Sequence, residues 1–248
     1  WIPCAGAAVS GSHWRAAFPW MMFRRRQGTV WHAVFSDHGG IFHPVLFCGN
    51  LYEAWGEEKD RLVRGLYSVL ERIGAKYPDL PMMLCSGGGG RTDYGALRYF
   101  TEFWPSDNTD PLERIFIQWG YSHFFPLKSM CAHVTNWNRS TSIKFRTDVA
   151  MMCKLGFDII VKDLPDDELQ FCRQALRNYN RLKHTILDGD FYRLVSPYEG
   201  QHAAMQTVSA DRTGSVVFAY DLNPRYGEQL PAVRLTGLDP DLRYRIRE

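Results

Sequence analysis

The segment from residue 85 to residue 110 contains the residues of this chain that are best suited to chemistry. It reads CSGGGGRTDYGALRYFTEFWPSDNTD. Its four consecutive glycines, 87 to 90, suit a place where the backbone bends sharply or lets a ligand come close. Trp104, Asp107, Asn108 and Asp110 follow within seven positions, so an aromatic ring stands beside carboxylates and an amide. This combination predicts a site that holds and cleaves sugars.

Other chemistries find less support in the same segment. Ser86 lacks the Gly-x-Ser-x-Gly turn of a serine nucleophile, and the glycines lack the Lys-Ser/Thr ending of a phosphate-binding loop. The six cysteines, at positions 4, 48, 85, 131, 153 and 172, are far apart and form no metal-ligand spacing. We therefore expect no metal and no organic cofactor.

Composition narrows the class of protein further. The chain has 248 residues, is 45% hydrophobic and carries 29 Lys and Arg against 27 Asp and Glu, so we expect a folded protein with no electrostatic attraction to nucleic acid or to a membrane. No apolar run approaches the roughly twenty residues that span a bilayer. Reduced thiols and the lack of a signal-like start predict a cytoplasmic protein. The sequence leaves a homo-oligomer open.

Elements that would position these residues can be followed from Lys59. Apolar residues at helical spacing predict a helix from there to Tyr77-Pro78, and LPMMLC at 80–85 reads as a buried strand that ends at the glycines. Further expected elements, in chain order, are a short helix at 96–100, a strand at 103–106, a helix at 111–118 capped by Asp110, a strand at 129–134, a helix at 145–155, a strand at 157–161 and a helix from Asp166.

Strands and helices that alternate at short intervals predict a parallel sheet with crossover helices. The glycines and the SDNTD cluster each follow a strand, so both belong at the rim formed by the carboxyl ends of the strands. After Asp188 the pattern changes to a period of two, in FYRLV, AAMQTVSA and GSVVFAYDL. We expect a second, all-β domain there.

Four motifs resemble a known family in their order and spacing. CSGGGGR at 85–91, WPSDNTD at 104–110, MCAHV at 130–134 and GDFYRLVSP at 189–197 are similar to the α-galactosidases of glycoside hydrolase family 36. The resemblance implies the C-terminal half of a (β/α)8 TIM barrel followed by an antiparallel β-sandwich. It divides the chain into an atypical segment at 1–55, barrel at 56–187 and an incomplete β-sandwich domain at 188–248.

The resemblance also implies an activity, which is hydrolysis of terminal α-linked galactose from oligosaccharides of the melibiose and raffinose type, with retention of configuration. Retention requires two carboxyl groups about 5 Å apart. Asp107 matches the family's acid/base, for which we expect partial burial, and Cys85 and Gly87 match positions against the galactose ring. An α-N-acetylgalactosaminidase or a galactosyl transferase on the same scaffold is an alternative.

The second carboxylate is missing from the pattern. The family carries its nucleophile in a Lys-Trp-Asp motif, which does not occur here, and Asp37 lies at a similar distance but in the unrelated context FSDHGG. A catalytically dead fragment of the same family is therefore a further alternative. Because residues 1–55 are off-pattern and the chain starts at Trp1, we expect a fragment or a reading-frame error upstream of about residue 50.

Several of these residues also have a purely structural interpretation. Trp104 either stacks on a sugar or fills the barrel rim, and His133 either bonds to substrate or packs in the core. Asp110 is expected to cap a helix and Arg91 to tie the glycine loop to a carboxylate.

Overall fold

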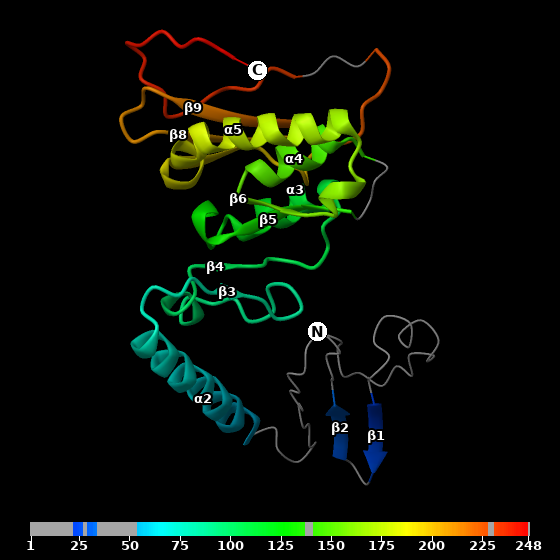
Figure 1. Ribbon diagram of the computed structural model, residues 1–248, viewed down its shortest axis with the longest axis vertical. Helices are drawn as coiled ribbons and strands as arrows, with labels where there is room; N and C mark the ends of the chain where they lie inside the picture. Colours follow the sequence, from blue (N-terminus) through cyan, green and yellow to red (C-terminus); the bar gives the residue numbers. More distant parts are fainter. Residues whose placement is uncertain (1–21, 27–28, 34–53, 137–140, 228–230, 248) are drawn as a thin grey trace. The chain divides into compact units, whose positions relative to one another are not determined.

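The computed structural model describes residues 22–26, 29–33, 54–136, 141–227 and 231–247, which group into two compact units, Trp1–Lys76 and Tyr77–Glu248 (Figure 1). The first unit contains an antiparallel hairpin of β1 (Met22–Arg26) and β2 (Thr29–Ala33), followed by helix α2 (Ala54–Lys76). The hairpin lies in the segment to which the sequence assigned no regular structure. The helix confirms the prediction, and it ends before Pro78 because proline disfavours helical geometry in the residue that precedes it.

Four short parallel strands form the sheet of the second unit. They are β3 (Met83–Leu84), β4 (Glu102–Phe103), β5 (Cys131–Thr135) and β6 (Lys154–Asp158). β3 pairs with β4 and β5 with β6, both in parallel, and a parallel bridge between Phe103 and Met130 links the two pairs. The predicted parallel sheet with crossover connections is confirmed.

Helices cross between these strands and cover them. The short 3-10 helix η1 (Ala96–Arg98) precedes β4, α3 (Pro111–Tyr121) precedes β5, α4 (Ile143–Met151) precedes β6, and α5 (Asp166–Asp188) closes the series. Two further 3-10 turns, η2 (Leu127–Ser129) and η3 (Val161–Asp163), lead into β5 and follow β6. Figure 1 shows α3, α4 and α5 between the parallel strands and the C-terminal sheet.

Several bounds differ from the sequence prediction. α4 ends at Met151 instead of 155, and β4 is confined to Glu102–Phe103 instead of 103–106. β6 occupies Lys154–Asp158 instead of 157–161, because Ile160 and Val161 are about half exposed and Val161 already belongs to η3. The apolar spacing of the last helix predicts a buried face of Leu169, Phe171, Leu176, Tyr179, Leu182 and Ile186. On α5, Tyr179 and Ile186 are buried as predicted, whereas Leu176 is 39% exposed and Cys172 and Ala175 are buried.

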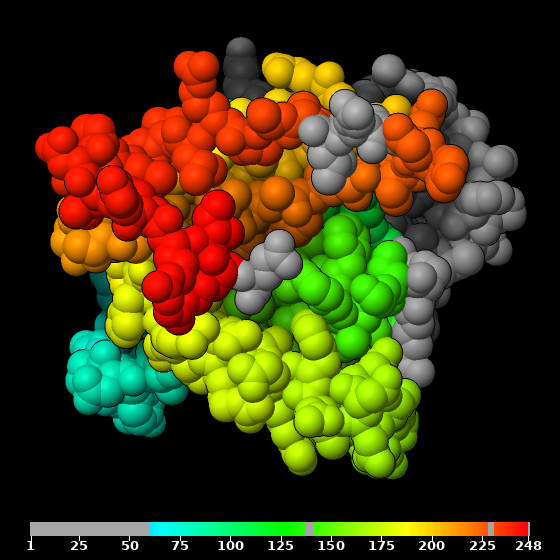
Figure 2. Space-filling model, turned by 90° about the horizontal axis from the view of Figure 1, so that it is seen from above, coloured from blue at the N-terminus to red at the C-terminus, as the bar shows by residue number. Residues whose placement is uncertain are grey.

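The C-terminal sheet is antiparallel, with β8 (His202–Val208) between β7 (Asp190–Val195) and β9 (Ser215–Asp221). All residues of β8 from Ala203 to Val208 are buried. One reason is α5, which contacts β8 and β9. Another is the segment 231–247, where the Thr236 amide donates to Oε1 of Gln206 at 2.9 Å; Figure 2 shows this segment in red and red-orange beside the orange strands. The expected β domain after Asp188 is therefore present.

Side chains of the C-terminal sheet bond directly to the helices of the second unit. The Tyr220 hydroxyl donates to the carbonyl of Asp148 at 3.2 Å, and its ring meets Phe145 edge-on. Arg193 donates through Nη1 to the carbonyl of Ser122 at 2.9 Å. Among the described residues, no helix is long and apolar enough to cross a bilayer.

Candidate active site

Asp107 lies in the loop that leaves β4 at its carboxyl end. The side chain is exposed, and within the described residues it makes no hydrogen bond or ion pair. The partial burial expected for the acid/base is therefore not found. The loop around it is fixed locally, since the Asn108 amide donates to Oγ of Ser106 at 3.1 Å and the Asp110 amide donates to Oδ1 of Asn108 at 3.0 Å.

The glycine loop packs against this segment through its backbone. The Gly89 amide donates to the carbonyl of Pro105 at 3.0 Å. Gly88 has a φ of 80°, and a Cβ there would lie 2.7 Å from the Cα of Ser106 and 3.1 Å from the backbone nitrogen of Asp107. The loop needs glycine at this position both for its left-handed backbone and for the close approach. It thereby fixes the backbone from which the Asp107 carboxyl projects.

Gly89 adds a second point of contact on the other side of the loop. A side chain on Gly89 would overlap the hydroxyl of Tyr121, which comes from the last turn of α3. The Tyr121 ring in turn packs on Phe103 of β4 at 5.3 Å between ring centroids. The glycine loop therefore packs against both β4 and α3, the two elements on either side of the segment that carries Asp107.

Asp110 is the N-cap of α3, as the sequence predicted. Its Oδ1 accepts from the amides of Leu112 and Glu113 at 2.9 and 3.1 Å, and Pro111 takes the first helical position. Two otherwise unsatisfied amides at the helix start are bonded in this way. Asp110 is thus engaged in structure, whereas the Asp107 carboxyl faces solvent.

Trp104 forms part of a stack that crosses the ends of the strands. The guanidinium carbon of Arg114 lies 4.3 Å from the Trp104 ring centroid, and the His133 ring lies 4.7 Å from it. His133 comes from β5, and its imidazole packs against Gly156 of β6, where any Cβ would overlap it. Arg114 therefore occupies a face of Trp104, the ring that the sequence assigned either to sugar stacking or to rim packing.

Burial controls the ionisation of the groups in this stack. His133 is half-buried, and desolvation lowers its pKa below the usual 6.5. Desolvation also lowers the pKa of Arg114 to about 10, against smaller opposing effects of Cys153, Cys131 and Asp107. Among the residues that the structure describes, Nε and both Nη atoms of the Arg114 guanidinium have no hydrogen-bond partner, although the residue is only 3% exposed.

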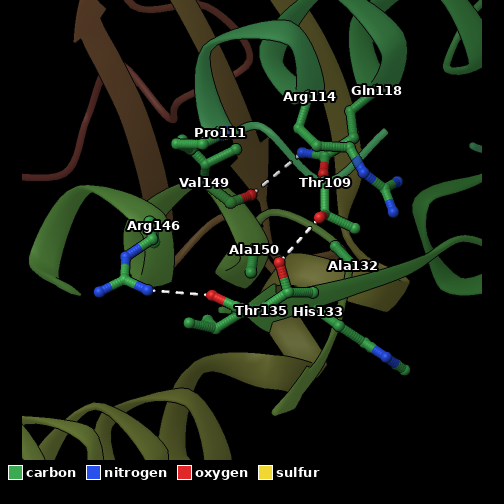
Figure 3. A pocket seen from close by; sticks show the side chains of 11 residues that line it. Thr109, Pro111, Arg114, Gln118, Ala132, His133, Thr135, Arg146, Val149 and Ala150 are labelled. Carbon is green, nitrogen blue, oxygen red and sulfur yellow. Dashed lines mark hydrogen bonds between the residues drawn. The ribbon is translucent and has the colours of Figure 1, made fainter. Parts of the chain in front are cut away.

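A cavity of about 10 Å³ lies behind the loop, between α3, α4 and β5. In Figure 3 its lining includes Thr109, Thr135 and Gln118, with the guanidinium groups of Arg114 and Arg146 at opposite sides. Thr109 and Thr135 share a hydroxyl hydrogen bond of 2.7 Å, and Arg146 donates to the Thr135 carbonyl at 2.9 Å. This volume suits about one water molecule. Cys85, Gly87 and Asp107 lie outside it and are exposed.

The structure thus brings the predicted glycine loop beside Asp107 and places Trp104 in the layer beneath. Sequence reasoning missed Arg114. In the sequence, Arg114 lies at helical spacing from Pro111, Ile115 and Gln118, which are buried on α3. A charged residue on the buried face of a helix is uncommon, so this position could have been recognised as a candidate functional residue. No group of three metal-ligating side chains occurs among the described residues, and Asp37 lies outside them.

Comparison with protein families matches nearly the whole chain after residue 47. The Melibiase family covers residues 48–189, more than half of the chain, and the glycosyl hydrolase family 36 C-terminal domain covers 202–248. The chain belongs to glycoside hydrolase family 36. The family-36 resemblance seen in the four motifs is confirmed.

Individual α-galactosidases of the family are similar to this chain in sequence and in structure. α-Galactosidase AgaA of Geobacillus stearothermophilus is 37% identical over 77% of this chain and 27% of its own length, and α-galactosidase 1 of Pediococcus pentosaceus is 36% identical over 77% and 27%. The structure of family-36 AgaA in complex with 1-deoxygalactonojirimycin matches with a TM-score of 0.69 and 38% identity, over 71% of this chain and 25% of that one. The Lactobacillus brevis α-galactosidase structure matches with a TM-score of 0.74 and 28% identity, over 80% and 28%.

The family-36 chain therefore spans about a quarter of the length of these relatives. Its fold corresponds to part of their TIM barrel together with a portion of the β domain that follows.

Proposed function

We propose that this chain is part of an α-galactosidase that hydrolyses terminal α-linked galactose from oligosaccharides of the melibiose and raffinose type. The observation that carries the proposal is the exposed Asp107 carboxyl, held by the glycine loop at the carboxyl ends of parallel strands in a family-36 fold. A variant of AgaA that is 38% identical to this chain, over 71% of this chain's length, has been solved in complex with raffinose. In this proposal the domain division at residues 55 and 187 stands as predicted.

Asp107 would act as the acid/base of a retaining mechanism. It would give its proton to the glycosidic oxygen as the bond to the sugar breaks, and then accept a proton from the water that releases the sugar. Cys85 and Gly87, exposed beside it, would contact the galactose ring. Trp104 would support this rim from below, since Arg114 covers a face of its ring.

The presence or absence of a catalytic nucleophile decides between an active enzyme and a chain that only binds galactose. Because the sequence contains no Lys-Trp-Asp motif, a galactose-binding chain without turnover is the second candidate function. A retaining reaction requires the second carboxylate, so turnover and binding must be measured separately.

The test combines an activity assay with a binding measurement on the purified chain. Release of p-nitrophenol from p-nitrophenyl α-galactoside, with α-galactose as the first-formed anomer by proton NMR, would support the retaining enzyme. Calorimetric binding of galactose without release would support the binding chain instead. If a folded chain shows no turnover and no binding, both candidate functions are refuted. Faster p-nitrophenol release from the p-nitrophenyl α-N-acetylgalactosaminide would indicate an α-N-acetylgalactosaminidase, and new oligosaccharides with excess acceptor would indicate a galactosyl transferase.

A further inference from the structure

Residues 104–110, which connect β4 to α3 and carry Asp107, are called the Asp107 loop below. In this loop Asp107 and Asn108 are exposed, whereas the next residue, Thr109, is partly buried and lines the small cavity between α3, α4 and β5 (Figure 3). Asp107 makes no hydrogen bond or ion pair of its own within the described residues. The position of its carboxyl group therefore depends on how the backbone on either side of it is held.

Thr109 is bonded to a buried residue at the carboxyl end of the neighbouring strand. The hydroxyl oxygens of Thr109 and Thr135 lie 2.7 Å apart, which is an ordinary length for a hydrogen bond between two hydroxyl groups. Thr135 is the last residue of β5 and is 7% exposed. The hydroxyl bond therefore joins the Asp107 loop to β5.

Helix α4 holds Thr135 from another side. Nη1 of Arg146 donates to the Thr135 carbonyl at 2.9 Å, and Arg146 is 6% exposed. Arg146 leaves α4 near its start, where Oγ of Ser142 caps the helix by accepting from the Phe145 amide at 3.2 Å. A hydrogen bond from a charged donor is stronger than one from a neutral donor. Thr109 is thus bonded to a residue that β5 and α4 fix together.

The Asp107 loop therefore has one anchor before the carboxylate and one after it. Before Asp107, the Gly89 amide donates to the Pro105 carbonyl at 3.0 Å. After it, Thr109 is bonded to Thr135, only two residues further along the chain. This second anchor depends on a hydroxyl group at position 109. Serine retains that group, whereas valine matches the shape of threonine but cannot make a hydrogen bond.

We propose that Thr109 is a positioning residue for Asp107, because its hydroxyl bond to Thr135 fixes the loop with the Asp107 carboxyl at the rim. This role rests on the acid/base function proposed for Asp107. Proton transfer requires the acid to lie within hydrogen-bond reach of the leaving oxygen, and a displacement of about 1 Å can cost about 10²-fold in rate. Thr109 points into the fold and so acts without touching the sugar.

The first test measures the mobility of the loop and needs no turnover. Backbone amide order parameters of residues 107–109, obtained by NMR relaxation, should be about 0.85 in the wild-type chain and should fall toward about 0.6 in Thr109→Val and Thr135→Val. Thr109→Ser should keep the wild-type values. Thr101→Val is the matched control, since it removes a hydroxyl that donates to the Met82 carbonyl at 3.1 Å, just before β4 begins.

Unchanged order parameters in a folded Thr109→Val, or an equal fall in Thr101→Val, overturn the proposal whether or not the chain hydrolyses galactosides. A fall confined to Thr109→Val and Thr135→Val supports it.

The second test separates positioning of the acid from a purely structural role by comparing two substrates. Thr109→Val should lower kcat/KM for melibiose by about 10 to 10²-fold. It should lower kcat/KM for p-nitrophenyl α-galactoside much less, because p-nitrophenolate leaves without a proton. Thr109→Ser should restore the activity on melibiose, and Thr109→Val should cause no further loss when it is added to Asp107→Asn.

Equal losses on both substrates, or a further loss in the Asp107→Asn background, would show that Thr109 only maintains the fold and would overturn its positioning role. A wild-type chain without turnover contradicts the proposed enzyme alone, and the order parameters then decide whether Thr109 fixes the loop.

Discussion

Gly88 packs directly against the backbone of Ser106, so the glycine loop and the segment that carries Asp107 are parts of one rigid arrangement. A Cβ on Gly88 would lie 2.7 Å from the Cα of Ser106. Contacts at this distance between a Cβ and a backbone atom require one segment to move. The position of the Asp107 backbone therefore depends on a residue nearly twenty positions earlier in the chain.

Replacement of Gly88 by alanine should displace the Asp107 segment. The φ of 80° disfavours any side chain and the new methyl group would clash with Ser106, so we expect a loss of about 1 to 3 kcal/mol in the free energy of unfolding. Galactose binding should weaken in parallel. Urea unfolding and calorimetry measure the two effects. Gly200→Ala is the control, because nothing lies within 4 Å of a Cβ there; equal effects of the two variants would argue against the close contact.

Asp110 and Asp107 should respond differently to mutation, although they lie three residues apart. Asp110→Ala removes the acceptor for the Leu112 and Glu113 amides, and we expect a loss of about 1 kcal/mol in stability. Asp107→Ala should change stability little, because its carboxyl is exposed and unbonded in the described structure. Thermal unfolding followed by circular dichroism compares them. A larger stability loss in Asp107→Ala would mean that Asp107 has a structural role.

Sequence patterns predicted the elements well where a single chain segment determines them. The α3 start at Asp110-Pro111 and the period-two strands after Asp188 are local signals, and both are present. The bounds of β6 and part of the buried face of α5 were misplaced, because the exposure of Ile160 and Leu176 and the burial of Ala175 depend on neighbouring elements. The same limit applies to the site, where Asp107 was identified from its motif but Arg114 required the three-dimensional stack.

The contact between Gly156 and His133 should be visible as an energetic coupling. Gly156→Ala places a methyl group into the imidazole of His133, and overpacking of this kind costs about 1 to 3 kcal/mol. In the double variant Gly156→Ala/His133→Ala the clash is absent. We therefore expect the combined loss to be smaller than the sum of the single losses, as measured by urea unfolding. Additive losses would show that the two residues do not interact.

His133 should make the fold sensitive to mild acid. Burial lowers its pKa below 6.5, so below this pH the unfolded chain binds a proton that the folded chain does not. The free energy of unfolding should therefore fall as the pH drops through 6.5, and the contribution of His133 should level off below its folded pKa. Urea unfolding at pH 7.5 and 5.5 should show a smaller decrease in His133→Gln than in the wild type. His184→Gln, at an exposed histidine, should keep the wild-type decrease; a similar response of both variants would exclude His133 as the source.

The acid/base assignment of Asp107 is tested most directly by comparing two substrates in Asp107→Asn. Melibiose has a sugar leaving group that needs a proton, whereas p-nitrophenolate leaves without one. We expect Asp107→Asn to lower kcat/KM for melibiose by about 10² to 10⁴-fold and to lower kcat/KM for p-nitrophenyl α-galactoside much less. Glu113→Gln should change neither value. Equal losses on both substrates, or full activity of Asp107→Asn on melibiose, would contradict the assignment.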